Sequence, residues 1–282
     1  MRFFQGKAWS VVALTSSLLL VAGCGSDTAE TESYTVTYTE DTTAREGRSL
    51  FTINVSNESG PIEGLTPTLS PMMAMNSGYS HSSPHQGCSE VGSGDYQCKV
   101  YYLMSSMMGT WTLTLNMDGE SASFNPDVMM AMNGNAKHQL KGQSDTVENM
   151  MGMPESRPYY IFKDSVSGST GSHNIALYIA TKESMMSFPA VTSSTLLNQG
   201  DASYELNINS VTVELSTDGS SWSTASEDGN GYYSVAGLSG LTDGTEGDLH
   251  VKLSVNGEQK TTNGLVPVGD GSNDYTTITF TP

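Results

Sequence analysis

Methionine is the residue type whose distribution most clearly points to chemistry. The chain has 282 residues and 16 Met, and every Met except Met1 lies between Met72 and Met186. Five adjacent pairs stand out: Met72-Met73, Met107-Met108, Met129-Met130, Met150-Met151 and Met185-Met186. Neighbouring side chains on a strand point to opposite faces, so at most one member of each pair can face the same core. Core packing, the common role of Met, therefore does not by itself explain the pattern.

Three of the pairs are followed by a small residue and a third Met, at residues 72–75, 129–132 and 150–153, and the first two of these triplets lie close to histidines. In an extended chain, side chains i and i+2 share a face about 6.5 to 7 Å apart, so two thioethers could converge on one ion. His81 follows Met75, and His138 follows Met132, in both cases by six residues, and His85 lies nearby. The candidate ligands form one group of Met72, Met73, Met75, His81 and His85, and a second group of Met129, Met130, Met132 and His138. The two groups could line one site, because the second falls at the end of the first predicted domain.

The chemistry of these side chains favours copper. Thioether sulfur is a soft, neutral ligand that selects Cu(I), whereas Mg²⁺ and Ca²⁺ prefer oxygen. A thioether needs no deprotonation, and it survives oxidising conditions better than a free thiolate. Two other interpretations remain open: packing of Met in a core or loop, and an exposed Met-rich surface that docks a partner protein.

Composition excludes several classes of function. Lys plus Arg total 12 against 30 Asp plus Glu, a net charge of −18, which excludes an electrostatic nucleic-acid binder. The sequence has no Gly-x-Ser-x-Gly, His-Glu-x-x-His or phosphate-loop motif, so we expect no enzyme. Turns such as residues 270–274 and 228–231 are rich in oxygen ligands and could take Ca²⁺, although such turns are common without an ion.

The N-terminus predicts export. Arg2 and Lys7 precede a mostly apolar run of about 15 residues, shorter than the roughly 20 that span a bilayer. The run ends in Leu20-Val-Ala-Gly-Cys24, which resembles a bacterial lipobox. We therefore expect a signal peptide over residues 1–23, lipidation of Cys24 and an acidic tether over 24–33; the alternative is an ordinary secretory signal. Gly25 is similar to the residue found at this position in lipoproteins sorted to the outer membrane, which implies an outer-membrane anchor facing the periplasm.

Period-two alternation predicts an all-β fold. Strand patterns cover residues 34–38, 49–57, 96–104, 110–117, 173–181, 211–216, 231–238, 249–255 and 275–281. Residues 110–120 align without gaps on residues 248–258, which indicates an internal repeat. We predict two tandem immunoglobulin-like β-sandwiches, residues 34–132 and 158–282, with a linker over residues 133–157 that is rich in turn residues.

Cys88 and Cys98 remain once Cys24 carries lipid. They flank a stretch in which Gly92 and Gly94 permit a tight reversal, so the two thiols could meet across a hairpin. Export favours a disulfide; the alternative is a pair of thiolate metal ligands.

Residues 46–125 resemble a known domain family. The segment 64–75, the His-bearing loop, Gly94-Asp-Tyr96 and the segment 107–115 are similar to the YtkA-like or FixH-type immunoglobulin-like domain. The resemblance implies an exported β-sandwich associated with copper handling or respiratory-oxidase maturation. That family has a Gly-His pair soon after the second Met, whereas here Asn76-Ser-Gly-Tyr-Ser80 precedes His81. The second sandwich is interpreted as a diverged, structural repeat.

Two functions follow as hypotheses. The first is a lipid-anchored periplasmic protein that holds Cu(I) through Met and His, for buffering or for delivery to a copper-accepting or respiratory-oxidase partner. The alternative is a non-metal structural or interaction module whose Met-rich surface docks another protein.

Overall fold

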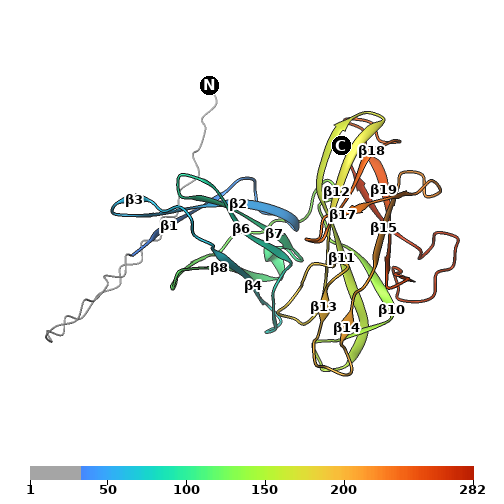
Figure 1. Ribbon diagram of the computed structural model, residues 1–282, viewed down its shortest axis with the longest axis horizontal. Helices are drawn as coiled ribbons and strands as arrows, with labels where there is room; N and C mark the ends of the chain where they lie inside the picture. The colour runs from blue at the N-terminus through green and yellow to red at the C-terminus, as the bar shows by residue number, and fades with distance from the viewer. Residues whose placement is uncertain (1–32) are drawn as a thin grey trace, which may run out of the picture.

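The computed structural model describes residues 33–282, and this part of the chain is all-β, as predicted. Figure 1 shows two lobes side by side, an N-terminal lobe in blue and green and a C-terminal lobe in yellow to red. The predicted signal peptide, Cys24 and the tether up to residue 32 lie outside the described residues. Among residues 33–282, no helix has the length and apolar character needed to cross a membrane.

The first lobe is a sandwich of two antiparallel sheets. One sheet has the order β1-β2-β7-β6, with β3 added to β2, and the other has the order β5-β4-β8-β9. The elements are β1 Thr35–Glu40, β2 Gly47–Asn57, β3 Gly60–Pro61, β4 Thr68–Met75, β5 Ser80–His81, β6 His85–Gly92, β7 Asp95–Tyr102, the 3-10 helix η1 Ser106–Met108, β8 Gly109–Met117 and β9 Glu120–Phe124.

Alternation along the central strands builds the core of this sandwich. Phe51, Ile53 and Val55 of β2 face Trp111 and Leu113 of β8, and all are buried in one cluster. The residues between them on each strand are more exposed. Full burial of a large apolar side chain contributes about 1.5–3 kcal/mol, so this inward face stabilises the pairing of the two sheets.

A disulfide closes the β6–β7 hairpin. Cys88 and Cys98 are bonded and lie directly opposite each other, with Cα atoms 4.1 Å apart. The reversal between the strands uses Gly92 and Gly94, both at positive φ, as the turn requires. The predicted disulfide is confirmed, and neither sulfur is a free thiolate for a metal.

The second lobe is also a sandwich. One sheet has the order β10-β11-β12-β18-β17, the other has the order β16-β15-β19-β20 with β21 on β19, and β13 pairs with β14. The elements are β10 His138–Glu148, β11 Pro154–Ser169, β12 Ser172–Thr181, β13 Leu196–Leu197, β14 Leu206–Asn207, β15 Val211–Ser216, β16 Ser223–Thr224, β17 Ser226–Glu227, β18 Tyr232–Leu238, β19 Gly247–Val255, β20 Glu258–Gln259 and β21 Thr276–Phe280.

The two aligned segments of the sequence form equivalent hairpins. β8 turns into β9 through Asp118-Gly119, and β19 turns into β20 through Asn256-Gly257. All four turn residues have positive φ, the geometry of a two-residue hairpin loop whose twist matches the flanking strands.

Residues 133–157, predicted as a linker, instead contain all of β10 and the start of β11. Leu140 and Val147 are both fully buried although they are seven positions apart, an odd offset that puts them on opposite faces of a regular strand. A register shift between Lys141 and Thr146 interrupts the strict alternation along β10. Because this bulge disrupts the period-two pattern, the sequence of residues 138–148 did not predict a strand. The connection between the last strand of one sandwich and the first of the next is residues 125–137.

Asp164 fixes the two sandwiches to each other. It is the unpaired residue of a bulge between Lys163 and Ser165 of β11, and its side chain is only 10% exposed. Its Oδ1 accepts bonds from three side chains of the first sandwich: Arg48 Nε at 3.1 Å, Lys99 Nζ at 2.9 Å and the Tyr101 hydroxyl at 2.7 Å. Burial and then the charge of Asp164 raise the pKa of Tyr101, so the phenol stays a hydrogen-bond donor.

An apolar cluster surrounds this contact. Tyr101 stacks on Tyr178 of β12 with ring centroids 4.2 Å apart, and it packs against Phe162 of β11 at 5.0 Å. Leu103 and Ala180 complete the buried cluster. Beside it, the Ser82 amide donates to the Met185 carbonyl at 2.8 Å, a backbone bond between the lobes. The junction is therefore packed and hydrogen-bonded like an interior.

Replacing Asp164 with Ala should loosen this junction. The change leaves Arg48 and Lys99 without their shared carboxylate, and a lost bond to a charged group costs about 2 kcal/mol. We expect the Asp164→Ala protein to unfold at lower urea concentration, with a free energy of unfolding lower by about 2 kcal/mol. Asp127→Ala, which removes an exposed carboxylate in the 125–137 connection, is the matched control. Equal stability of the two variants would contradict the role assigned to Asp164.

Candidate metal site

The β4–β5 hairpin places Met75 and His81 near each other. The turn is closed by a bond from the Met75 amide to the Tyr79 carbonyl, 2.8 Å long. On the sheet, His81 pairs with Met73 of β4, and Met73 pairs with Trp111 on its other side. His81 is therefore held by a strand at the edge of the sheet, next to the core.

The environment of His81 sets its tautomer and its charge. The side chain is 3% exposed, and its ring meets Trp111 edge to face at 5.4 Å. Nδ1 lies 2.6 Å from the Ser82 carbonyl, which can only accept, so Nδ1 carries the proton. Burial lowers the pKa of His81; the Ser82 contact opposes this, and nearby Lys137 adds to it. The imidazole is therefore neutral at neutral pH, with its lone pair on Nε2.

Nε2 of His81 is buried and has no hydrogen-bond partner. Leaving such an atom unsatisfied costs about 1–3 kcal/mol, so an unpaired imidazole nitrogen needs an explanation. A neutral imidazole whose other nitrogen is held by a backbone carbonyl is the arrangement found in metal-ligating histidines. His81 thus has the tautomer and the unpartnered Nε2 lone pair that a metal ligand would need.

A cavity of about 520 Å³ lies between the two sandwiches, and His81 is part of its wall. The first lobe contributes Met75, Tyr79, His81, Leu103 and Met104, and residues from the connection and the second lobe contribute Lys137, Asn149, Met150, Met151, Glu155, Tyr160, Lys182, Met185 and Phe188. Five thioethers and one imidazole therefore share one cavity.

Local structure presents the methionines of the cavity. The Trp111 indole donates to the Met104 carbonyl at 2.9 Å, which holds that segment against the core. In the β10–β11 turn, Asn149 Oδ1 accepts bonds from the amides of Met151 and Met153, at 2.8 and 3.0 Å. Met185 sits in the turn after β12 and bonds to Ser82 of the other lobe. The docked lobes thus bring together the Met104 segment, the β10–β11 turn and the turn after β12.

The cavity wall contains one ion pair and one further lysine. Lys182 is paired with Glu155 at 2.7 Å. Burial lowers the pKa of Lys137, and Glu46 partly opposes this. Among residues 33–282, no group of three or more His, Cys, Asp or Glu could hold a metal. The sulfur and imidazole donors at this cavity would suit a soft monovalent cation, and the one carboxylate in its wall, Glu155, is already paired with Lys182.

The first predicted ligand group is only partly assembled here. Met75 and His81 line the cavity. Met73 is fully buried in the core of the first sandwich, so the packing interpretation applies to it, and Met72 points to the other face of β4 and is half-buried. His85 begins β6, and its Nδ1 contacts the Ser83 carbonyl at 2.9 Å, away from the cavity wall.

The second predicted group does not line this cavity. Met129, Met130 and Met132 are exposed in the 125–137 connection, where Met129 bridges to Arg45. His138 begins β10 and is half-buried, and its Nε2 also has no hydrogen-bond partner. Burial lowers the pKa of His138. The structure does not bring the two groups together at this cavity, because Met129 pairs with Arg45 and none of the four residues of the second group lines the cavity wall.

Four of the five methionines in the cavity wall are absent from the predicted ligand groups: Met104, Met150, Met151 and Met185. Met150 and Met185 belong to two of the adjacent pairs noted in the sequence, so the signal was present. Their position in space could not be predicted from the sequence, because they meet Met75 and His81 only when the two lobes dock.

Comparisons with known proteins give no family. No family model matches the sequence, and no curated protein matches it. The resemblance of residues 46–125 to the YtkA-like domain therefore stays a prediction.

Solved structures similar to this chain include bacterial surface proteins and titin domains. The Yersinia pseudotuberculosis adhesin InvE is 13% identical with a TM-score of 0.27, over 87% of this chain and 58% of the adhesin chain. A chimeric titin Z1Z2 is 11% identical with a TM-score of 0.21, over 88% of this chain and 94% of its own. Domains 4–9 of the surface layer protein SbsC are 12% identical with a TM-score of 0.24, over 89% and 31%. The chain thus spans well under two thirds of the adhesin, and similarity at these scores carries no argument about function.

Proposed function

We propose that this chain is an exported, lipid-anchored protein that binds Cu(I) in the cavity between its two sandwiches. His81 Nε2 and thioethers from both lobes are the ligands, and the bound ion is buffered or delivered to a partner. Cys24 carries the lipid anchor, which holds the protein on the outer membrane, facing the periplasm.

One observation carries the copper proposal: the unpartnered lone pair of a neutral, buried imidazole beside a wall of five methionines. A Cu(I) ion would give Nε2 the partner that it lacks. The ion is monovalent and the ligands are neutral, so binding buries one positive charge and leaves no second charge for a carboxylate to balance. A hard cation is disfavoured, because the one carboxylate in the cavity wall, Glu155, is already paired with Lys182.

The cavity is larger than one ion needs, and this supports loading and release. Met has three rotatable bonds, so its sulfur can move toward an ion without backbone change. Met151 is 80% exposed while also lining the cavity, and it connects the interior to solvent. The ion can therefore pass from one thioether to the next on its way to a partner such as a copper-accepting or respiratory-oxidase protein.

Exposed methionines outside the cavity favour a second candidate function, a Met-rich surface that docks a protein without metal. Met107, Met130 and Met132 are each more than half exposed. In this case, Leu at these three positions should leave a soluble partner bound as before, because Leu keeps the apolar area, whereas Gln should weaken the complex. A complex that forms only in the presence of Cu(I) would instead favour delivery of the ion.

The copper proposal predicts which side chains control affinity. His81→Ala should weaken Cu(I) binding at least about tenfold. Removing a residue that only orients a metal ligand already lowers metal affinity by about that factor, and His81 is itself a proposed ligand. The triple variant Met75/Met104/Met185→Leu should weaken binding similarly, since Leu fills the same space without a donor. Affinity is measured anaerobically by competition with a chromogenic Cu(I) chelator.

The matched control is Met129/Met130/Met132→Leu, which removes as many thioethers from outside the cavity. It should bind Cu(I) like the unchanged protein. If this control lost as much affinity as the cavity variant, or if His81→Ala bound normally, the assigned site would be wrong.

The lowered pKa of His81 also predicts how binding depends on pH. Protons and Cu(I) compete for Nε2, so affinity should be constant above the pKa of His81 and fall as pH drops below it. Because that pKa lies below 6.5, we expect no loss of affinity between pH 8 and about 6.5. The residual binding of His81→Ala should lack the decline at lower pH. Chelator competition across pH tests this, and a decline that begins near pH 8 would contradict it.

A further inference from the structure

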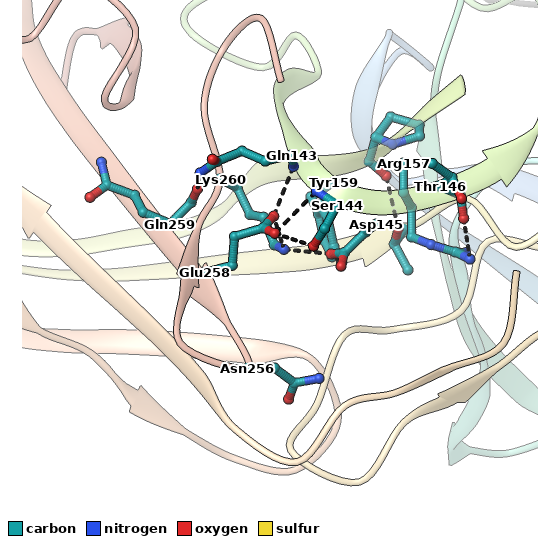
Figure 2. Close-up of polar contacts among 12 residues, drawn as sticks. Gln143, Ser144, Asp145, Thr146, Arg157, Tyr159, Asn256, Glu258, Gln259 and Lys260 are labelled. Atoms are coloured by element: carbon teal, nitrogen blue, oxygen red, sulfur yellow. Dashed lines mark hydrogen bonds and ion pairs between the residues drawn. The ribbon is translucent and has the colours of Figure 1, made fainter. Parts of the chain in front are cut away.

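A second unusual cluster lies within the C-terminal sandwich, apart from the cavity. Lys260, directly after β20, is fully buried. Its Nζ lies 2.5 Å from Asp145 Oδ2 and 2.7 Å from Glu258 Oε1 (Figure 2). An amine and two carboxyl groups are therefore in direct contact, with the amine closed off from water.

The cluster connects the two sheets of this sandwich. Asp145 belongs to the bulge of β10 in one sheet, and Lys260 follows β20 at the edge of the other. Next to them, Lys141 and Thr261 exchange two backbone hydrogen bonds of 2.6 and 3.1 Å. These bonds fix the two segments side by side, so Lys260 and Asp145 meet without depending on a flexible loop.

Neighbouring groups orient both carboxylates. The Tyr159 hydroxyl donates to Asp145 Oδ2 at 2.5 Å, and Lys260 Nζ lies 5.3 Å from the centre of the Tyr159 ring. Glu258 accepts bonds from the Gln143 amide at 2.8 Å and from the amide and hydroxyl of Ser144 (Figure 2). Burial raises the pKa of Glu258, but the bonds from Lys260, Ser144 and Gln143 outweigh it and bring the pKa to about 2.

We propose that Lys260 and Asp145 condense into an intramolecular amide bond, with Glu258 moving the proton. The bond would join residues 115 apart in sequence and staple the first strand of the second sandwich to the end of its β19–β20 hairpin.

The reaction balances without any co-reactant. The ammonium of Lys260 passes one proton through Glu258 to the Asp145 carboxylate, giving a neutral amine and a neutral acid. The amine attacks Asp145 Cγ, Glu258 takes the second proton from nitrogen, and the Tyr159 hydroxyl stabilises the charge on the attacked carboxyl. The C–O bond then breaks, the leaving hydroxyl takes the proton from Glu258, and one water departs.

Two physical terms favour the reaction at this place. A buried ion pair has a desolvation penalty that its attraction only partly offsets, and the amide removes both charges. Reactants held in contact reach effective molarities of about 10⁵–10⁸ M, which offsets the unfavourable condensation in water. The pair Lys182–Glu155 has the same 2.7 Å contact as Lys260–Glu258, but Glu155 is 42% exposed, and within residues 33–282 no second carboxylate forms an ion pair with Lys182.

Tryptic digestion of the purified full chain tests the proposal. Trypsin does not cut after an acylated Lys, and Pro158 blocks cutting after Arg157, so residues 142–163 and 253–282 should appear as one joined species. Its mass should equal that of the two peptides less one water. Release of separate peptides 253–260 and 261–282 as the main species overturns the proposal, and this readout needs no variant to fold.

Variants assign the roles. Asp145→Ala should leave Lys260 free, whereas Asp145→Asn should lose ammonia and give a joined species of the same mass as the natural one. Glu258→Gln keeps both reactants and should leave Lys260 free, with its fold checked by circular dichroism. Full joining in Glu258→Gln overturns the role of Glu258. Lys182→Arg, which alters the other buried Lys–Glu pair, is the control and should join fully.

Discussion

The docking of the two sandwiches around Asp164 is the constraint on which the candidate metal site depends. A bulge in β11 turns this carboxylate toward the other lobe, where Arg48, Lys99 and Tyr101 surround it. The stacked rings of Tyr101 and Tyr178 exclude water from the same contact. Because the cavity walls come from both lobes, the positions of its side chains are only as fixed as this junction. A charged, directional contact inside an apolar cluster sets one relative orientation, where apolar packing alone would tolerate several.

The chemistry-bearing side chains lie on turns, while the strands hold those turns in place. Met151 and Met185 lie in turns, Met75 is the last residue of β4 before a turn, and His81 belongs to a two-residue edge strand. Turns can carry ligands without disturbing a core, and sandwich scaffolds position them. The residues of the proposed amide bond also lie outside regular strand backbone: Lys260 comes just after the short strand β20, and Asp145 lies in the bulge of β10. Irregular backbone is where this fold brings reactive groups together.

Particular residues show how far the sequence leads. The alternation at residues 211–216 matches β15 at both ends, and the Met72-Met73 argument holds on β4, where only Met73 enters the core. Met73 was nonetheless predicted as a ligand, because alternation does not say which member of a Met pair faces the core. Val100, Tyr101 and Tyr102 are three consecutive buried residues, a break in alternation that marks a strand covered on both faces. That break was the one local sign of the junction.

What the sequence determined by itself was local: strand alternation, the hairpin turns at 118–119 and 256–257, and a hairpin able to bring Cys88 and Cys98 together. Each depends on neighbours along the chain, whose geometry follows from period-two backbone and turn chemistry. Only the tertiary structure decided that Met75 and His81 share a cavity with Met150 and Met185, and that β10 belongs to the second sandwich. Those outcomes depend on bulges and on packing between distant segments, which local residue periodicity does not encode.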